Sequence, residues 1–210
     1  MEQDLFGNKT TDKDITLKNA AQINGLKVYF DFITRKEETE LLFNIDKNEW
    51  LSGLKRRVQH FGYKYDYKKR QIDRGFFIGE IPNWMNFLFK RLSDKEIISF
   101  DPDQAIINEY VNDQGISAHI DCEPCFGNTI ISISLGGQCI INFQKELTSK
   151  EYQKVPLLIP PRTLIVMKDE SRYQWYHGIP SRKSDKFNGE VHKRKRRVSI
   201  TFRKVILDEQ

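Results

Sequence analysis

The sequence has 210 residues, of which 39% are hydrophobic and 30% are charged, as is usual for a soluble globular protein with one sizeable core. The formal net charge of +5 permits a polyanionic partner without requiring one. The sequence contains no run of about 18 apolar residues, so no membrane span is expected. The polar start and an odd cysteine count without a secretion signal predict a cytoplasmic location, or a nuclear one in a eukaryote.

The first half of the chain is expected to hold a tail and two helices. Residues 1–25 are polar and weakly patterned, which favours an N-terminal tail ordered only in part. Residues 26–33 form a strand-like run. A helix is predicted after Thr34, because Thr34 and Glu37 have the spacing of a capping box. A second helix is predicted from Pro82, after which apolar residues recur at helical spacing.

The second half of the chain, residues 99–206, changes to short strand-like runs. Many short strands separated by Gly, Pro, Asn and Asp favour a jelly roll, a sandwich or a barrel. Helices followed by such a set predict an α+β chain with an all-β core. We expect residues 26–98 to carry the N-terminal helices and a substrate lid, the whole forming one compact domain and a monomer. The strand-like runs are QAIINEYV, TIISISL, QCIINF, VPLLIP, TLIVMK, YQWYHGI and RVSITFRKVI.

One histidine and one aspartate are candidate metal ligands. His119 and Asp121 are two residues apart in AHID, so on a strand both side chains face the same side. A facial triad of two histidines and one carboxylate leaves open positions that suit non-haem Fe(II). His177, in YHGI at the end of a late run, is the best third ligand. His60 and His192 are less suitable, because their surroundings are strongly basic or irregular.

A pair of arginines in the last run indicates an anionic ligand. Arg197 and Arg203 are six residues apart, so on a strand both share one face with Ser199. Guanidinium groups inside an apolar barrel are costly unless they meet anions. A dicarboxylate would satisfy both by bidentate pairing. Asn108 and Tyr110 repeat the same spacing and add an amide and a phenol on one face.

Together these motifs, in this order and spacing, resemble the AlkB family of Fe(II)/2-oxoglutarate dioxygenases. The resemblance extends from about Leu26 to Val205 and implies a double-stranded β-helix, a form of jelly roll, with Fe(II), 2-oxoglutarate as cosubstrate and O₂. It implies that Fe(II) is bound by His119, Asp121 and His177. It also implies that Arg197 binds the distal carboxylate of 2-oxoglutarate and Arg203 the carboxylate nearer the metal. The cosubstrate pocket would be completed by Asn108 and Tyr110, with Ser199 as a weaker candidate.

The stretch Arg56–Arg70, here called the lid segment, resembles the nucleotide-recognition lid of that family. Its tyrosines alternate with charged residues, so aromatic faces could stack on an extruded base while cations meet phosphates. Tyr65 is the best candidate for stacking, followed by Tyr63. The alternative is a hairpin whose tyrosines pack on the core. Glu123 is a candidate catalytic or substrate-pairing acid beside Asp121, or a loop acid exposed to water.

The function implied by the resemblance is oxidative demethylation of N-alkylated bases in DNA or RNA, with release of formaldehyde, succinate and CO₂. A second hypothesis is a tRNA-base hydroxylase on the same scaffold. A third is a non-catalytic jelly-roll module that binds nucleic acid, and a fourth, less favoured, is a protein dealkylase. The sequence does not separate DNA from RNA, or single from double strands.

Two further motifs are ambiguous from the sequence. Cys122 and Cys125 form C-x-x-C, which occurs in redox pairs and in half zinc sites. The absence of a second such pair favours free thiols on an active-site loop, and Cys139 is expected within a strand. The basic run Lys193–Arg197 is a localisation tag, a phosphate-binding patch or a solvated loop.

Overall fold

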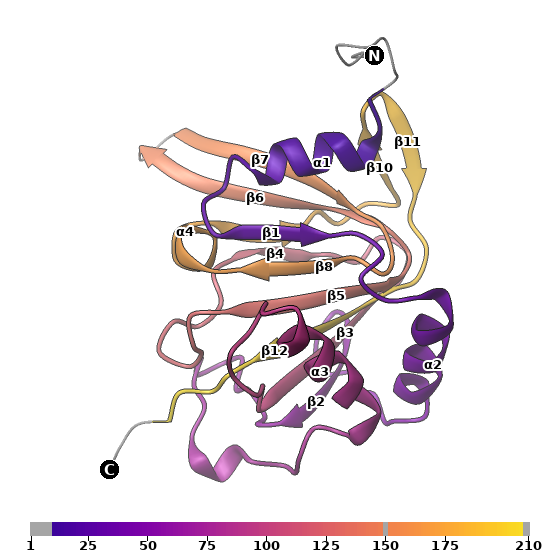
Figure 1. Ribbon diagram of the computed structural model, residues 1–210. Helices are drawn as coiled ribbons and strands as arrows, with labels where there is room; N and C mark the ends of the chain where they lie inside the picture. The colour runs from indigo at the N-terminus through magenta and orange to yellow at the C-terminus, as the bar shows by residue number, and fades with distance from the viewer. Residues whose placement is uncertain (1–9, 149–150, 208–210) are drawn as a thin grey trace.

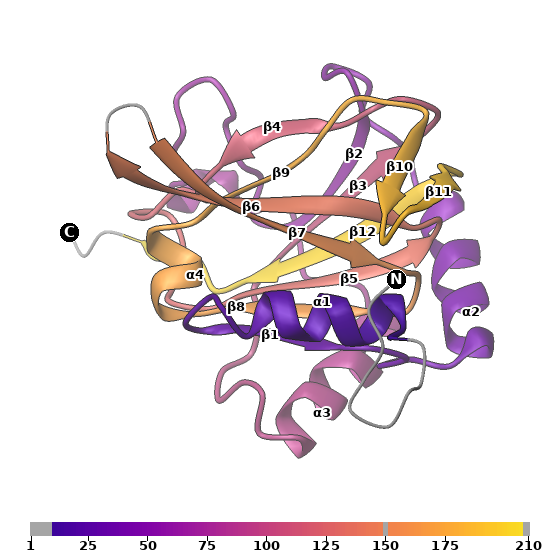
Figure 2. The same cartoon turned by 90° about the horizontal axis from the view of Figure 1, so that it is seen from above.

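The computed structural model describes residues 10–148 and 151–207, which form two facing antiparallel sheets (Figures 1 and 2). This is the α+β, double-stranded β-helix architecture expected from the sequence. The larger sheet runs in the order β1 (Leu26–Tyr29), β8 (Leu164–Met167), β5 (Ile130–Gly136), β12 (Arg197–Arg203), β3 (Gln104–Tyr110) and β2 (Arg57–Gly62). The smaller sheet runs β4 (Ile116–His119), β9 (Tyr176–Ile179), β6 (Cys139–Thr148) and β7 (Glu151–Ile159). A separate hairpin consists of β10 (Ser184–Phe187) and β11 (Glu190–Lys193).

Strand β12 lies in the middle of the larger sheet, paired with β3 on one side and β5 on the other. Alternate residues of a strand point to opposite faces of its sheet. Val198, Ile200 and Phe202 accordingly lie in the main apolar core, on the outer face. That face is covered by helices α2 (Arg35–Asp46) and α3 (Asn86–Asp94). The other face of β12 faces the smaller sheet.

The capping box predicted at Thr34 is confirmed. The hydroxyl of Thr34 accepts from the backbone N–H of Glu37 at 3.2 Å, and the Glu37 carboxylate accepts from the backbone N–H of Thr34 at 2.7 Å. The helix buries Leu41 and Ile45 toward the sheet, as its apolar spacing predicts. The second predicted helix is α3, preceded by a 3₁₀ turn at Asn83–Met85.

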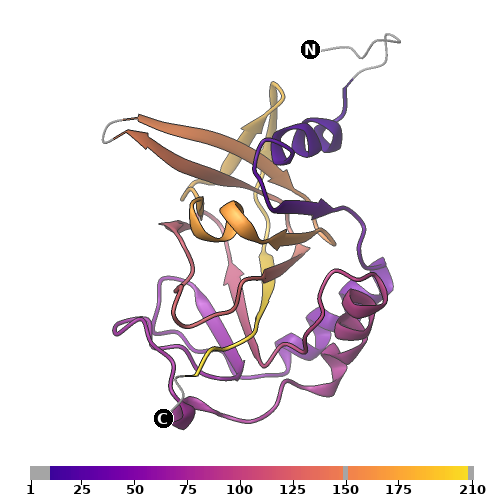
Figure 3. The ribbon, with the colours of Figure 1, turned by 60° about the vertical axis from the view of Figure 1, so that its left-hand side comes forward.

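Part of the expected tail is a helix. Residues Asp12–Ala20 form α1, which lies against β7 (Figures 1 and 3). The Thr16 hydroxyl donates to the Leu158 carbonyl at 3.3 Å, and the Asn19 amide donates to the Pro156 carbonyl at 2.9 Å. The sequence did not indicate this helix because it docks through polar side chains rather than through an apolar stripe.

The lid segment leaves the larger sheet at Gly62. This residue has φ of 75°, and a Cβ there would lie 1.8 Å from the Asp103 carbonyl oxygen, so the chain can turn out of β2 only with glycine. After Gly62 the chain continues through irregular turns and a 3₁₀ turn at Arg74–Phe76. Across the described ranges, no helix is long and apolar enough to cross a membrane.

Candidate active site

A cavity of about 530 Å³ opens between the two sheets. One wall is the inner face of β3 and β12, and the opposite wall is made by β4, β6 and β9. The lid segment contributes part of its mouth. The cavity is lined by residues from nearly every motif that the sequence singled out, among them Asn108, Tyr110, His119, Asp121, His177, Arg197, Ser199 and Arg203.

The three expected metal ligands converge on this cavity. His119 ends β4 and lies directly opposite His177 on β9, with ring centroids 4.4 Å apart. Asp121 follows immediately, with its Oδ1 atom 3.5 Å from Nε2 of His119. One donor atom from each of the three residues lies within 4.8 Å of the other two. Two imidazoles and one carboxylate in this arrangement suit a first-row divalent metal.

A glycine beside His177 permits the close strand approach. A Cβ at Gly178 would lie 2.8 Å from both Cα and N of Ala118 on β4. A residue with a side chain would therefore push β9 away from β4 and separate the two histidines. Gly178 thus allows β4 and β9 to pack closely beside the candidate metal ligand His177.

Charge around Asp121 keeps it a carboxylate. Burial alone would raise its pKa, but the Arg203 guanidinium and the hydrogen bond with His119 outweigh burial and hold the pKa well below its usual range. Arg203 donates from Nε to Oδ2 of Asp121 at 3.1 Å. Burial, together with the neighbouring His119, lowers the pKa of His177 to about 3. His177 is therefore a neutral imidazole at pH 7, the form that binds metals.

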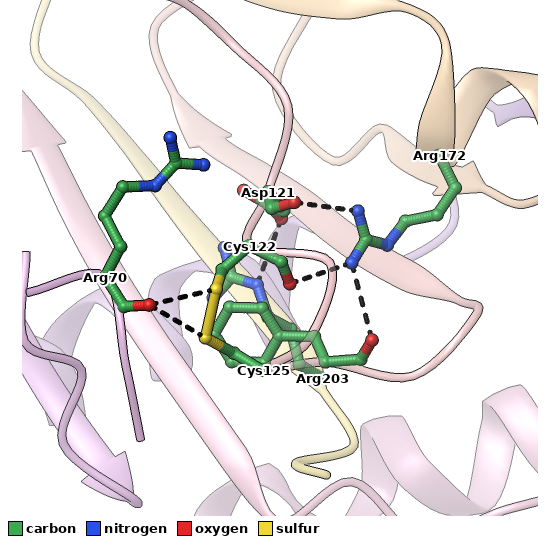
Figure 4. Close-up of a disulfide and its surroundings, with 7 residues drawn as sticks. Arg70, Asp121, Cys122, Cys125, Arg172 and Arg203 are labelled. Atoms are coloured by element: carbon green, nitrogen blue, oxygen red, sulfur yellow. Dashed lines mark hydrogen bonds and ion pairs between the residues drawn. A yellow bond between two sulfur atoms is a disulfide. The ribbon is translucent and has the colours of Figure 1, made fainter.

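Arg172 fixes the loop that carries Asp121, and no sequence pattern indicated it. Arg172 lies on the short helix α4 (Asp169–Tyr173) and is 2% exposed. Its guanidinium donates to the backbone carbonyls of Asp121 at 3.0 Å and of Cys122 at 3.1 Å (Figure 4). It also donates to the carbonyls of Phe126 and Gly127. These contacts hold the backbone that presents the carboxylate.

Arg197 has an unsatisfied donor inside the cavity. Its Nε donates to the Ser134 hydroxyl at 2.9 Å, and its guanidinium lies 5.4 Å from the ring centroid of Tyr110. Its Nη1 is buried and has no acceptor among the described residues. A buried guanidinium N–H without an acceptor costs about 1–3 kcal/mol, which a carboxylate ligand would recover. The residues present therefore fit a diacid next to a metal.

The other expected cosubstrate contacts are placed in different ways. Ser199 is buried on the cavity face, between the two arginines. Asn108 is buried and accepts from Nε of Arg56 at 2.8 Å through its side-chain oxygen. Arg203 was expected to contact a cosubstrate carboxylate. In the structure it donates to Asp121 and to Gln104, so it orients the candidate metal-binding carboxylate, and its contact with a cosubstrate stays a prediction.

Of the residues predicted to contact the substrate, only Tyr65 lines the cavity. Tyr65 lines the cavity and packs its ring 5.7 Å from that of Phe126. Tyr67 also lines it, with a buried hydroxyl that has no partner among the described residues. Tyr63 is not a lining residue, because it pairs across the turn with Phe77, ring centroids 5.3 Å apart. Glu123 is exposed and does not line the cavity either.

The cysteine motif differs from the expectation of free thiols. Cys122 and Cys125 are joined by a disulfide, because the tight turn between them brings their Cα atoms to 5.3 Å. Cys139 is a buried free thiol in β6, as expected. The expectation was wrong because spacing alone does not show how sharply a loop turns.

Two arginines of the basic run pair with acidic residues of the protein. Arg194 binds Asp185 with distances of 2.8 and 2.9 Å, and Arg196 binds both Glu109 and Asp46. Arg197, the last residue of the run, lies on β12 and lines the cavity. The guanidinium groups of Arg194 and Arg196 therefore stabilise the fold and are not free to bind phosphates.

The two histidines that were set aside lie outside the cavity lining. His60 is buried in β2, and burial lowers its pKa to about 4. His192 lies on β11, where its Nε2 is 3.5 Å from a carboxylate oxygen of Asp12. The structure therefore supports His177 as the partner of His119.

Cations surround the cavity mouth. Lys55, Arg56 and Arg70 all line it, in addition to the two arginines of β12. Asp121 is the only acidic residue in the lining that the structure describes. The field at the mouth therefore favours anionic or neutral ligands over cations.

The sequence and fold were compared with known proteins. Residues 31–203 match the family model described as the 2OG-Fe(II) oxygenase superfamily. The chain belongs to the 2OG-Fe(II) oxygenase superfamily. It is an AlkB-like 2-oxoglutarate-dependent dioxygenase, and this membership implies Fe(II), 2-oxoglutarate and O₂.

Relatives of this superfamily member include proteins of similar length and longer ones. An uncharacterized protein, L905, of Acanthamoeba polyphaga mimivirus is 36% identical, with 94% of this chain and 92% of that protein covered. An Arabidopsis thaliana protein named "Alkylated DNA repair protein ALKBH8 homolog" is 37% identical, covering 87% of this chain. A Xenopus tropicalis tRNA (carboxymethyluridine(34)-5-O)-methyltransferase alkbh8 is 34% identical, covering 86% of this chain. The chain spans 59% of the Arabidopsis protein and 32% of the Xenopus protein.

A solved structure, that of OsALKBH1, shares the fold with a TM-score of 0.64. The match covers 86% of this chain and 98% of that chain, at 16% sequence identity. The likeness supports the jelly-roll architecture of the AlkB-like dioxygenases.

Proposed function

We propose that this dioxygenase binds Fe(II) through His119, Asp121 and His177 and oxidises a C–H bond on a modified base of a nucleic acid. The observation that carries the proposal is the convergence of these three side chains beside a buried guanidinium with an unsatisfied donor. With the metal and 2-oxoglutarate bound, the site supplies an oxidant for C–H hydroxylation, coupled to formation of succinate and CO₂.

The protein's own part is to bind and to orient. Arg197 offers its unsatisfied Nη1 to the distal carboxylate of the cosubstrate, and Tyr110 packs against that guanidinium. Arg203 and Arg172 hold Asp121 through its side chain and its backbone. An enclosed site in which these groups are already placed avoids reorganisation during the reaction.

The charge of the cavity mouth bears on the substrate. Lys55, Arg56 and Arg70 favour contact with phosphates, and the aromatic ring of Tyr65 offers a surface on which a base can stack. A cationic base would meet these cations without a free acid to pair with, because Glu123 lies outside the cavity lining. The lining is therefore better suited to a neutral or acidic modified base.

We accordingly favour hydroxylation of a modified tRNA base. The name of the Xenopus relative, a methyltransferase of a tRNA uridine, supports tRNA as the substrate. Oxidative demethylation of an N-alkylated base is the second candidate, supported by the name of the Arabidopsis relative. A neutral N-methylated base would fit the same lining. Both reactions use the same oxidising site and differ in whether the hydroxylated carbon stays attached.

One assay separates the two candidates. Purified protein with Fe(II), 2-oxoglutarate and ascorbate is incubated with bulk tRNA and with methylated DNA and RNA oligonucleotides. Nucleoside mass spectrometry and formaldehyde detection are then run on the same samples. A stable gain of one oxygen in a tRNA nucleoside supports hydroxylation, whereas formaldehyde release with loss of a methyl group supports demethylation. Succinate formation that no nucleic acid stimulates would contradict a nucleic-acid substrate.

A further inference from the structure

Cys122 and Cys125 belong to the loop that carries the candidate metal ligand Asp121, and they face the lid segment. Cys122 and Cys125 are each 5% exposed and are joined by a disulfide (Figure 4). The bridge links residues only three positions apart in the chain. Cross-links stabilise mainly by closing long loops, so a purely structural role explains this bridge poorly.

Both sulfur atoms contact one backbone carbonyl of the lid segment. Sγ of Cys122 lies 3.2 Å, and Sγ of Cys125 lies 3.4 Å, from the carbonyl oxygen of Arg70 (Figure 4). These separations suit S–H donors. A thiol can donate a weak hydrogen bond to a carbonyl, but a disulfide sulfur carries no hydrogen. A hydrogen bond to the Arg70 carbonyl therefore forms only while the pair is reduced, and in the disulfide form the sulfur atoms and this oxygen are in van der Waals contact.

We infer that Cys122 and Cys125 form a redox modification site, which exchanges with small-molecule thiol–disulfide couples and in its reduced form fastens the lid segment to the metal-binding loop. In the oxidising step, two protein S–H bonds and the S–S bond of one small-molecule disulfide break. One protein S–S bond and two small-molecule thiols form, so that two electrons and two protons pass to the reagent.

The loop is held in place independently of this redox change. Arg172 donates to the carbonyl of Cys122, and the backbone N–H of Ile206 donates to the carbonyl of Cys125 at 2.9 Å. The bond from Ile206 and a bridge between Phe126 and Val205 tie the loop to the segment after β12. Oxidation is therefore expected to leave Asp121 in place and to act on the lid segment instead.

Residues 66–71 form a hydrogen-bonded turn of the lid segment, and the carbonyl of Arg70 is the group of this turn that contacts the cysteines. The backbone N–H of Arg70 donates to the carbonyl of Asp66 at 2.8 Å, and Asp66 bridges to Gln71. Loss of the sulfur donors at Arg70 thus removes the hydrogen bonds between this turn and the loop that carries Asp121. Cys122 lines the cavity, so a small reagent can reach the pair from that side.

The test uses the full chain without metal, equilibrated in reduced or in oxidised glutathione. Mass spectrometry after alkylation reports the thiol state, and hydrogen exchange reports the amides of residues 66–71. In the wild type we expect a Cys122–Cys125 disulfide in oxidised glutathione. Lid exchange should then be faster by about threefold or more, the size of effect that one or two weak hydrogen bonds support.

Two variants make the outcome decisive. Cys122→Ala/Cys125→Ala lacks both donors and should show fast lid exchange in either buffer. Cys139→Ala, which changes the buried thiol in β6, should keep the wild-type response. Failure to form the disulfide, or equal lid exchange in both buffers with the disulfide formed, would overturn the inference. Neither readout needs a substrate, so the result is independent of the proposed function.

Discussion

His119 on β4 and His177 on β9 are directly opposed in the register of the smaller sheet, with their ring centroids 4.4 Å apart although the chain between them forms several other strands. A cross-strand pair of this kind is held by the backbone hydrogen bonds of the ladder. The two histidines of the candidate metal site are therefore held by the sheet itself. Asp121 lies two residues after the end of β4, in the loop that follows.

Replacing one ligand should remove metal binding while leaving the fold intact. In His119→Ala, a divalent metal such as Mn²⁺ should no longer raise the melting temperature. In the wild type, metal at about 100 times its dissociation constant should stabilise the fold by ~2.7 kcal/mol. Thermal unfolding with and without metal measures this. His60→Gln is the control, because His60 lies outside the cavity lining and belongs to no candidate metal group of the described residues. A full metal response in His119→Ala would contradict the assignment.

Replacing Arg197 should weaken cosubstrate binding. Arg197→Gln removes the charge and the unsatisfied donor, so the KM for 2-oxoglutarate should rise about 10- to 100-fold, as expected for a charge-assisted hydrogen bond of ~1.5–3 kcal/mol. Metal affinity should change little. The neighbouring Arg196→Gln is a matched control, because Arg196 binds Glu109 and Asp46 outside the cavity. Equal KM values in Arg197→Gln and the wild type would exclude the role.

Arg172 should act as a positioning residue for Asp121. Arg172→Met loses the donors to the backbone of the metal-binding loop, so metal affinity should fall about 10- to 100-fold, the usual effect of losing an outer partner of a ligand. Calorimetric titration with Mn²⁺ measures it. Arg162→Met, which breaks a bond to Glu38 on α2, should cost stability without changing the metal affinity. Unchanged metal binding in folded Arg172→Met would argue against positioning.

The cations at the cavity mouth should govern the salt dependence of nucleic-acid binding. For Lys55→Gln and Arg70→Gln, the slope of log affinity against log salt should each become shallower by about 0.7 for a single strand. Fluorescence anisotropy between low and moderate salt measures the slopes. Lys90→Gln serves as the control, because Lys90 lies on α3 and pairs with Asp94 there. If all three variants kept the wild-type slope, nucleic acid would not bind over this mouth.

The ion pair between Glu37 and Arg91 should make stability depend on pH. Hydrogen bonding to Arg91 lowers the pKa of Glu37 from 4.5 to about 2. Because the folded pKa is the lower one, this stabilisation is complete above pH 4.5 and is lost as the pH falls toward 2. Its upper bound is about 3.5 kcal/mol at ~1.4 kcal/mol for each pKa unit, and solvent screening of this partly exposed pair reduces it. Urea unfolding of wild type and Glu37→Gln at about pH 6 and about pH 3 should show the difference shrinking at the lower pH.

The core of the site could be predicted from the sequence because strands repeat every two residues. His119 with Asp121, and Arg197 with Ser199 and Arg203, needed only this period to be placed on one face each. The capping box at the start of α2 was equally local. These local features were therefore recovered, whereas the disulfide between Cys122 and Cys125, which is also local, was missed because spacing does not show how sharply a loop turns.

The other parts that were missed depend on contacts between distant segments. Arg172 reaches the loop of Asp121 across 51 residues, and nothing in its local sequence marks it as buried. Tyr67, rather than Tyr63, faces the cavity because of the path of the lid turn after Gly62. Helix α1 was missed because it docks through Thr16 and Asn19, which carry no apolar period.

The alternation along β12 has a consequence for how this protein can change. One face of β12 lines the cavity, and its other face packs against α2 and α3. Sliding the strand by a single position would bury guanidinium groups among aliphatic side chains and turn Val198, Ile200 and Phe202 toward bound ligands. The proposed recognition of a diacid would thus depend on the same strand register as the fold, and sequence variation is more easily accommodated in the segments around the cavity mouth.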